Sequence, residues 1–158
     1  MSTPLSEQSR PEGAIEVLLS RLPHAGDLPL PSPATPGSAG YDLASAEDGE
    51  LAPLERRLFR TGFSIAVPDG YECQLRPRSG LALRHGITLP NTPATIDSDY
   101  RGELMVALVN LGTDAFRITR GMRIAQMIVA RVERVSFRAV EALPPTSRGG
   151  GGFGSSGS

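Results

Sequence analysis

Short runs in which apolar and polar residues alternate, broken at close intervals by turn residues, constrain the fold of this chain most. The alternation covers residues 63–67 and returns over residues 71–75, with a Pro-Asp-Gly sequence at residues 68–70 between them. That composition is typical of a hairpin turn between two half-buried strands. Residues 104–109 are instead almost continuously apolar, which indicates a strand covered on both faces. Many short strands with frequent turn signals predict an all-β fold, either a sandwich or a jelly-roll-like barrel.

The rest of the chain adds further strands and a single plausible helix. Four prolines make residues 28–36 extended and unable to form a regular ladder. The helix is short, residues 79–85, and Gly86 closes it as a C-terminal stop. Further strands are expected at residues 16–19, 116–118, 123–130 and 135–139.

Length and composition limit the class of protein. A chain of 158 residues is one domain, and we expect a disordered tail at 1–13, a β domain at 14–143 and a flexible Gly/Ser-rich arm at 144–158. The net charge of −1 gives no general attraction to nucleic acid or to an anionic membrane. No apolar run approaches the roughly 20 residues that a membrane helix needs.

The cysteine and aromatic contents add two expectations. The single cysteine, Cys73, excludes an internal disulfide and a Cys-based zinc site, and it fits a reducing compartment. We therefore predict a cytoplasmic protein, with Cys73 facing the core of its strand. The chain has no Trp, three Tyr and five Phe, so its own core is modest, which favours an oligomer.

The last eleven residues, 148–158, are patterned in a way that a plain linker is not. They hold Arg148, then Phe153 within a glycine run, and then the hydroxyls of Ser155 and Ser156. Arg and Ser donate to phosphate oxygens, and a Phe ring can cover a nucleobase. Most Gly/Ser-rich ends are flexible linkers, and the match to a phosphate-binding P-loop is loose because no Lys precedes Ser155. The hypothesis is a tail that folds over a nucleotide.

Two further loops hold charged or polar side chains, one before the alternating run at residues 63–67 and one after the run at residues 71–75. Asp42 stands beside a glycine at a strand entry; taken alone, such an Asp is usually a turn residue. Arg78 and Ser79 stand at the start of the short helix, where free N–H groups favour an anion. Ser79 could equally be the N-cap of that helix, and both interpretations can hold together.

A third loop, residues 95–102, holds Asp97 and Asp99 two positions apart. Such a pair could bind a metal, although in a turn these side chains more often cap backbone N–H groups. Together with the arginines and with Asp42, this loop completes a set of groups suited to metal-assisted hydrolysis of a nucleoside triphosphate.

The chain resembles the trimeric deoxyuridine triphosphate nucleotidohydrolases (dUTPases) in order from about Leu30 to the end. All five motifs of that family are present, at residues 39–43, 77–82, 91–102, 121–126 and 148–157. The resemblance implies a jelly-roll-like distorted β-barrel with one short helix, assembled as a homotrimer with three active sites at subunit junctions. Motifs one, two and four would come from one subunit, motif three from a second, and the tail from the third.

The resemblance also implies a reaction. Asp97 would be the general base for a water that attacks the α-phosphorus of dUTP, giving dUMP and pyrophosphate. Mg2+ would bridge the triphosphate oxygens, with Asp42 holding its water ligands and Gln126 supporting them. The reaction would supply dUMP for dTMP synthesis and keep uracil out of DNA.

The substrate contacts implied by the resemblance are equally specific. Asn91 would read the uracil edge, Tyr100 would pack under the deoxyribose and reject UTP, and Phe153 would cover the base. The full set of substrate-binding residues expected on this ground is Arg78, Ser79, Gly80, Asn91, Ile96, Tyr100, Met105, Gln126, Arg148, Phe153, Gly154, Ser155 and Ser156.

Two other functions remain open from the sequence. A deoxycytidine triphosphate deaminase, a relative that shares the fold, would by resemblance carry a glutamate in the Asp97 segment, and none lies between Asn91 and Gly102. A nucleotide-gated regulatory module could keep the pocket without catalysis, but Asp42, Asp97 and Arg148 are all intact. His24 and His85 receive no role, and we expect them at the surface or at a helix end.

Overall fold

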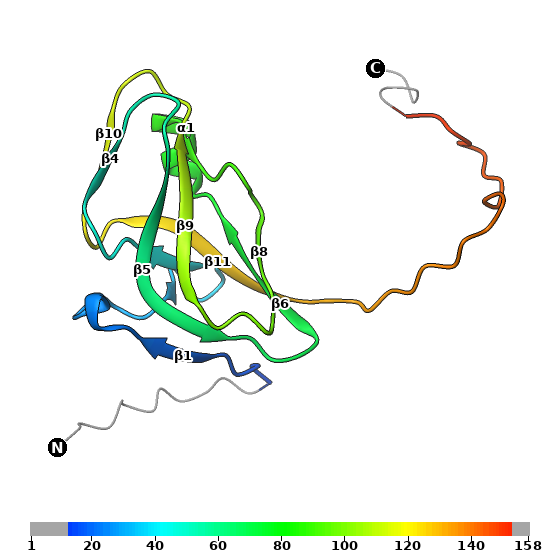
Figure 1. Cartoon of the computed structure of the whole chain (residues 1–158), viewed down its shortest axis with the longest axis horizontal. Coiled ribbons are helices and arrows are strands. Elements are labelled where there is room, and N and C mark those ends of the chain that lie inside the picture. The colour runs from blue at the N-terminus through cyan, green and yellow to red at the C-terminus, as the bar shows by residue number, and fades with distance from the viewer. Residues whose placement is uncertain (1–12, 153–158) are drawn as a thin grey trace.

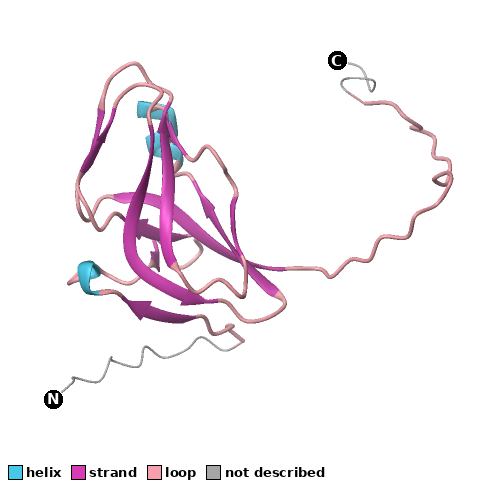
Figure 2. Ribbon diagram, viewed as in Figure 1, coloured by secondary structure: helices cyan, strands magenta, loops and turns pink. Residues whose placement is uncertain are grey.

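The computed structural model describes residues 13–152, which form β-strands with one short α-helix (Figure 1, Figure 2). The predicted all-β class with a single short helix is therefore confirmed. In chain order the elements are β1 (Leu18–Arg21), the 3-10 turn η1 (Pro23–Ala25), β2 (Ser32–Pro33), β3 (Tyr41–Ala44), β4 (Gly49–Leu51), β5 (Arg56–Ala66), β6 (Tyr71–Arg76), α1 (Ser79–His85), β7 (Ile87–Thr88), β8 (Ala94–Ile96), β9 (Glu103–Asn110), β10 (Phe116–Ile118) and β11 (Arg123–Arg131).

These strands form two main sheets, and every strand pair is antiparallel. One sheet has the order β1-β5-β9-β7, the other has the order β2-β3-β11-β6-β8, and β10 pairs with β4. Alternate residues of both sheets are buried in one apolar cluster, for example Phe59 and Val106 from the first and Leu43 and Leu75 from the second. Sheets that share a core in this way are typical of a sandwich or jelly roll.

The predicted turn at residues 68–70 is confirmed, but the predicted hairpin is wrong. Gly70 has φ +82° and the Tyr71 N–H donates to the Pro68 carbonyl. The strands on either side, β5 and β6, nevertheless belong to different sheets. Alternation requires only that each strand turn one face to the core, and both strands satisfy it from opposite sides of that core.

The strand predicted at residues 135–139 is also wrong. No strand follows β11 within the described residues, and Phe137 is 97% exposed. The segment alternates correctly, but a strand needs a neighbour for its N–H and C=O groups, and within residues 13–152 it pairs with none. In Figure 1 residues 132–152 run outward from the sheets, and their last part, 144–152, is the described portion of the expected arm. The predicted tail at 1–13 lies outside the described residues, except for Gly13.

The predicted helix and its stop signal are confirmed. The helix at Ser79–His85 ends at Gly86 in the left-handed conformation, with φ +70°. Residue 78, however, is the N-cap and no side chain caps the helix, so the N-cap assignment of Ser79 is wrong. Residues 28–33 run without a turn, but 34–36 bend into one, and Ser32–Pro33 pair with β3 as β2, so the expectation that 28–36 forms no ladder is wrong. The first strand begins two residues later than expected.

The remaining single-residue expectations concern Cys73 and the histidines. Cys73 is fully buried in β6, as predicted, and burial first and the Glu72 carboxylate second raise the pKa of its thiol to about 12. His85 ends α1, and its ring packs against that of Phe116 at a tilt of 42°. Within residues 13–152, no helix is both long and apolar enough to span a membrane.

Candidate active site

Three side chains from two other motifs lie around Asp42 of β3. We call the four residues the Asp42 cluster: Asp42, Arg78, Arg123 and Gln126. The Arg78 Nε lies 3.3 Å from Asp42 Oδ1, and the Arg123 Nη1 donates to Oδ2 at 3.0 Å. Arg78 also donates to the Arg123 carbonyl at 3.2 Å. The Asp42 side chain is only 17% exposed, so two guanidinium groups more than neutralise its charge where water is partly excluded.

Strand register explains why these residues meet. β11 lies between β3 and β6, and Gln126 of β11 is opposite both Asp42 and Arg76. The Gln126 amide donates to the Pro77 carbonyl at 3.0 Å, which links β11 to the segment that enters α1. A Cβ on Gly40 would clash with Gln126 Oε1, so any other residue there would force the Gln126 amide to move from this position.

The start of α1 adjoins the cluster. β6 ends at Arg76, and Ser79 and Gly80 are the first two residues of the helix. The N–H groups of a first helical turn have no partner inside the helix. Residues 78–80 therefore place a guanidinium group, a hydroxyl and backbone donors together, which is the donor set expected for phosphate oxygens.

A second region of candidate residues lies along and after β8. Asn91 is exposed near the cis Thr92–Pro93 peptide, and Ile96 is half-buried as the last residue of β8, opposite Cys73 of β6. The next six residues, 97–102, are called here the Asp97 loop. Within the described residues, no hydrogen bond or ion pair holds the Asp97 carboxylate. It lines an open depression of about 550 Å³ whose charged members are Asp69, Glu72, Asp97, Asp99 and Arg134.

Tyr100 is fixed within this loop at both ends. Its N–H donates to the Asp97 carbonyl at 3.1 Å, and its hydroxyl donates to the Glu103 carbonyl at 2.9 Å. A Cβ on Gly102 would clash with the Tyr100 hydroxyl, so glycine permits the ring to fold back on the loop. The ring is 39% exposed, as is Met105 on β9.

One chain does not bring its two acidic regions together. Asp42 is opposite Gln126, which is itself opposite Arg76, whereas Asp97 follows the residue opposite Cys73, on the other side of β6. β3 and β8 are three strand spacings apart, and Asp97, one residue beyond the level of Cys73, differs from Asp42 by four residues along β6. At about 4.8 Å per spacing and 3.3 Å per residue, this is on the order of 15 Å or more.

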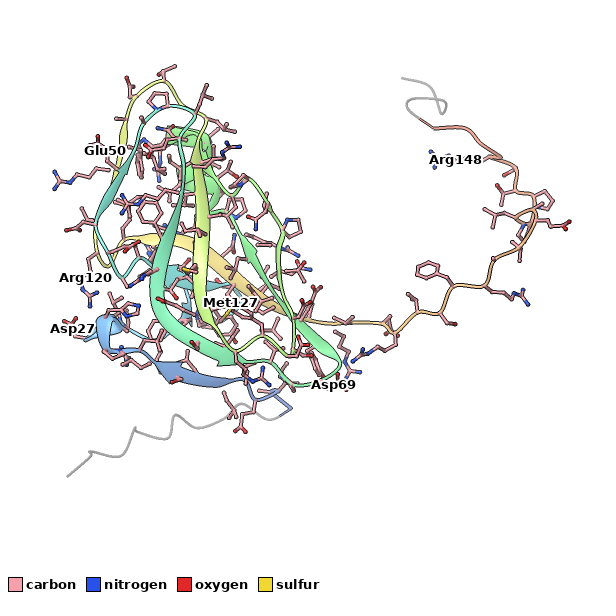
Figure 3. The ribbon with its side chains drawn as sticks, viewed as in Figure 1. Asp27, Glu50, Asp69, Arg120, Met127 and Arg148 are labelled. Atoms are coloured by element: carbon pink, nitrogen blue, oxygen red, sulfur yellow. The ribbon has the colours of Figure 1, made fainter. Side chains whose placement is uncertain are left out.

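The described part of the arm, residues 144–152, contacts neither region; of the segment after β11, Val132 and Arg134 line the depression at Asp97. Arg148 is exposed and its Nε donates to the Gly151 carbonyl of the arm itself; Figure 3 shows it far from the sheets. The other predicted arm residues, Phe153, Gly154, Ser155 and Ser156, lie outside the described residues.

Arg123 has no role predicted from the sequence, although it lies in the family motif at residues 121–126. Its ion pair with Asp42 joins residues 81 positions apart. The only signal in the sequence was its place three residues before Gln126. Without the register of β3 on β11, the pairing could not be found.

The donor set of the Asp42 cluster fits Mg2+. Asp42 and Gln126 place oxygen atoms on adjacent strands at paired positions, and Mg2+ binds through one or two carboxylates with the rest from phosphates and water. Within residues 13–152, no three His, Cys, Asp or Glu side chains are grouped to hold a metal. The cluster therefore suits an ion that arrives with phosphates better than an all-protein cage.

Comparison with known proteins decides the family. The sequence model of the dUTPase family matches residues 27–157. The chain belongs to the dUTPase family. The deoxyuridine 5'-triphosphate nucleotidohydrolase of Zymomonas mobilis is 55% identical over 143 residues, covering 90% of this chain and 98% of that protein. The corresponding protein of Rhizobium meliloti is 51% identical over 161 residues, covering 99% of each chain.

Solved structures of the dUTPase family share the fold. The dUTPase of Staphylococcus bacteriophage 80alpha, solved with dUPNHPP, superposes with a TM-score of 0.83 at 25% identity, covering 92% of this chain and all of that one. A single-residue mutant of the dUTPase of phage phi11 of S. aureus gives a TM-score of 0.75 at 20% identity, covering 83% of this chain and all of that one. The predicted jelly-roll-like fold is thereby confirmed.

Proposed function

We propose that this protein is a dUTP diphosphatase that hydrolyses dUTP to dUMP and pyrophosphate, with Mg2+ as its cofactor. The observation that carries the proposal is the meeting of three dUTPase motifs at Asp42, through Arg78 and Gln126. The Zymomonas mobilis relative, 55% identical, is named a deoxyuridine 5'-triphosphate nucleotidohydrolase. With one carboxylate and two guanidinium groups the cluster keeps a net positive charge, which suits a polyphosphate, and buried ion pairs of this kind are weak stabilisers of a small β domain.

Asp97 is the general base in this proposal. Its carboxylate is not engaged by any group among residues 13–152, so its lone pairs are available to a water. That water attacks the α-phosphorus, its proton moves to the Asp97 carboxylate, and pyrophosphate leaves. A positioned base of this kind contributes typically about 10²–10⁴-fold to a rate.

Asp42 and Gln126 would hold the hydration shell of Mg2+. When bound with the nucleotide, the ion neutralises charge on the phosphate oxygens. The structure of the mutant phi11 dUTPase is described as revealing the coordination of a structural Mg(II) ion, which supports a magnesium site within this fold.

Phosphate binding falls to two segments. Arg78, Ser79 and Gly80 hold the phosphates at the start of α1, and Arg148, Ser155 and Ser156 close on them from the arm. Because Arg78 is already paired with Asp42, its guanidinium group has exchanged part of its water for a carboxylate before the nucleotide binds. Phosphate oxygens that accept from Arg78 therefore do not have to desolvate an isolated, fully hydrated charge.

The region along and after β8 supplies selectivity. Asn91 reads the uracil edge, and Ile96 and Met105 line the pocket beside the sugar. Tyr100 packs under the deoxyribose and excludes a 2′-hydroxyl. From the arm, Phe153 covers the base and Gly154 allows the backbone to approach it.

The separation within one chain supports a site shared between subunits, in a homotrimer. Asp97 lies on the order of 15 Å or more from Asp42, so one chain does not supply both to one nucleotide. Leu58 of β5 is 55% exposed, Met105 of β9 is 39% exposed, and Phe137, in the segment after β11, is almost fully exposed. Contacts between copies would cover such apolar side chains. In this assembly residues 14–143 form the body, and the arm at 144–158 closes over a neighbouring site.

The test is nucleotide selectivity with pyrophosphate as the readout. Purified protein with Mg2+ should release pyrophosphate from dUTP far faster than from dCTP, dTTP or UTP. Ammonia release from dCTP would indicate the deaminase alternative, and no product from any nucleotide would indicate a regulatory module. A solution mass showing only monomers at full activity would contradict the shared site.

A further inference from the structure

Glu103, at the start of β9, connects three segments that are far apart in the sequence. Its Oε1 accepts a hydrogen bond from the Gly62 N–H at 2.9 Å and lies 2.6 Å from His24 Nε2. Its main-chain oxygen accepts the Tyr100 hydroxyl at 2.9 Å. The Glu103 side chain is only 15% exposed, so these contacts are shielded from water more than most surface pairs.

The backbone at this point lacks its regular ladder. β5 and β9 pair in register up to Arg60, and pairing resumes only at Ser64, opposite Glu103. Such a bulge leaves backbone groups without ladder partners. Two side chains replace them: the Glu103 carboxylate accepts from the Gly62 N–H, and the Thr61 hydroxyl donates to the Leu104 carbonyl at 2.7 Å.

The opposite side of the junction is held by η1. Gly62 has φ +78°, and a Cβ there would lie 2.5 Å from the Ala25 Cβ, so η1 packs directly on the bulge. Arg120 donates to the carbonyls of His24 and Ala25 at 2.9 and 2.7 Å. Figure 3 shows Arg120 beside this turn. His24 therefore reaches Glu103 from a turn that is itself fixed.

We propose that Glu103 is a positioning residue for Tyr100, with His24 as its outer anchor. The Tyr100 hydroxyl is held by the backbone of Glu103, and that backbone is held by the Glu103 side chain where the ladder is interrupted. The junction sets how closely the ring approaches the sugar, and thus the selectivity for dUTP over UTP. This inference rests on the proposed function, because it needs Tyr100 to contact the deoxyribose.

The first experiment compares E103A with E50A in the full-length protein. Glu50 lies on the exposed face of β4, and no hydrogen bond or ion pair holds it within the described residues. E103A should raise the KM for dUTP about three- to tenfold, the scale of one lost hydrogen bond, with kcat nearly unchanged. The dUTP/UTP ratio of kcat/KM should fall by a similar factor. E103Q keeps an oxygen acceptor for the Gly62 N–H and should restore most of both.

A double-mutant cycle separates positioning from general destabilisation. Y100F removes the hydroxyl that Glu103 holds, so adding E103A to Y100F should change the dUTP/UTP ratio little further. If E103A does not fold, H24A replaces it in the cycle, with an expected loss of about twofold that is absent in the Y100F background.

The outcomes distinguish this inference from the proposed function. A wild-type protein without dUTP hydrolysis overturns both. An active wild type in which E103A, or H24A in its place, keeps the selectivity of E50A overturns only the positioning role. A selectivity loss that persists unchanged in the Y100F background overturns it equally.

Discussion

Asp42 and Asp97 are two carboxylates of one proposed site that lie in opposite surroundings. Both oxygens of Asp42 face guanidinium groups, from Arg78 at 3.3 Å and from Arg123 at 3.0 Å. Asp97 has no such partner within the described residues and opens onto a depression that also holds Glu72 and Asp99. The first carboxylate is fixed by its neighbours, and the second is left available.

The difference supports the separate roles proposed for the two residues. A carboxylate held by two arginines has few lone pairs left for a proton but a well-defined position, which suits the ordering of water around a metal ion. An unpaired carboxylate can accept a proton from a water. The Asp42 cluster is also complete within one chain, whereas in the proposed assembly a second chain brings Asp97 to the phosphates. In this proposal the Asp42 cluster orders the metal and its water, and Asp97 accepts the proton.

The largest expected effect comes from removing the base. D97N should lower kcat for dUTP by about 10²–10⁴-fold, because an amide cannot take the proton from the attacking water. Binding of a non-hydrolysable dUTP analogue, measured by calorimetry, should change little. D99N is the matched control two residues along the same loop. Activity of D97N equal to that of D99N would assign the base elsewhere.

The next largest effect concerns the arm, which contacts neither acidic region in the described chain. Deleting residues 148–158 removes Arg148 and the hydroxyls that close on the phosphates, and each charged hydrogen bond contributes about 1.5–3 kcal/mol. We expect kcat/KM to fall by roughly one to three orders of magnitude. The thermal midpoint should be unchanged, because residues 148–152 are mostly exposed. An unfolded truncated protein would instead make the arm structural.

Local sequence patterns predicted the helix and the strands around each acidic region. They did not predict how those strands are arranged relative to one another. The helix at Ser79–His85 was predictable because Gly86 is a local stop signal. Strand alternation identified the buried faces, yet it did not place β5 and β6 in different sheets, since partner choice depends on the whole topology. The prediction of a strand at residues 135–139 was wrong for the same reason.

The candidate site shows the same limit. The roles of Asp97 and Asp42 were expected from a motif resemblance, and no periodicity in the sequence indicated them. The pairing of Arg123 with Asp42 spans 81 positions and depends on the register of β3 on β11. A bulge between Arg123 and Ala125 shifts that register. No local signal in the sequence fixes a bulge of this kind.

The smallest effect tests whether the Asp42 cluster is preorganised at all. In G40A the new Cβ would clash with Gln126 Oε1, so the amide must rotate and give up its bond to the Pro77 carbonyl. Losing one such bond costs about 0.5–1.5 kcal/mol. We therefore expect the Mg2+ concentration for half-maximal activity to rise about two- to tenfold, with kcat at saturating Mg2+ nearly unchanged.

Gly37 provides the control for G40A in the segment before β3. A Cβ at Gly37 has no atom within 4 Å, so G37A should leave the Mg2+ dependence unchanged. Both variants replace glycine by alanine, and they therefore share any effect on the entropy of the unfolded chain. A difference between them isolates the contact with Gln126. If G40A and G37A have the same Mg2+ dependence, the close packing of Gln126 does not contribute to magnesium binding, and Asp42 alone accounts for the contribution of this cluster.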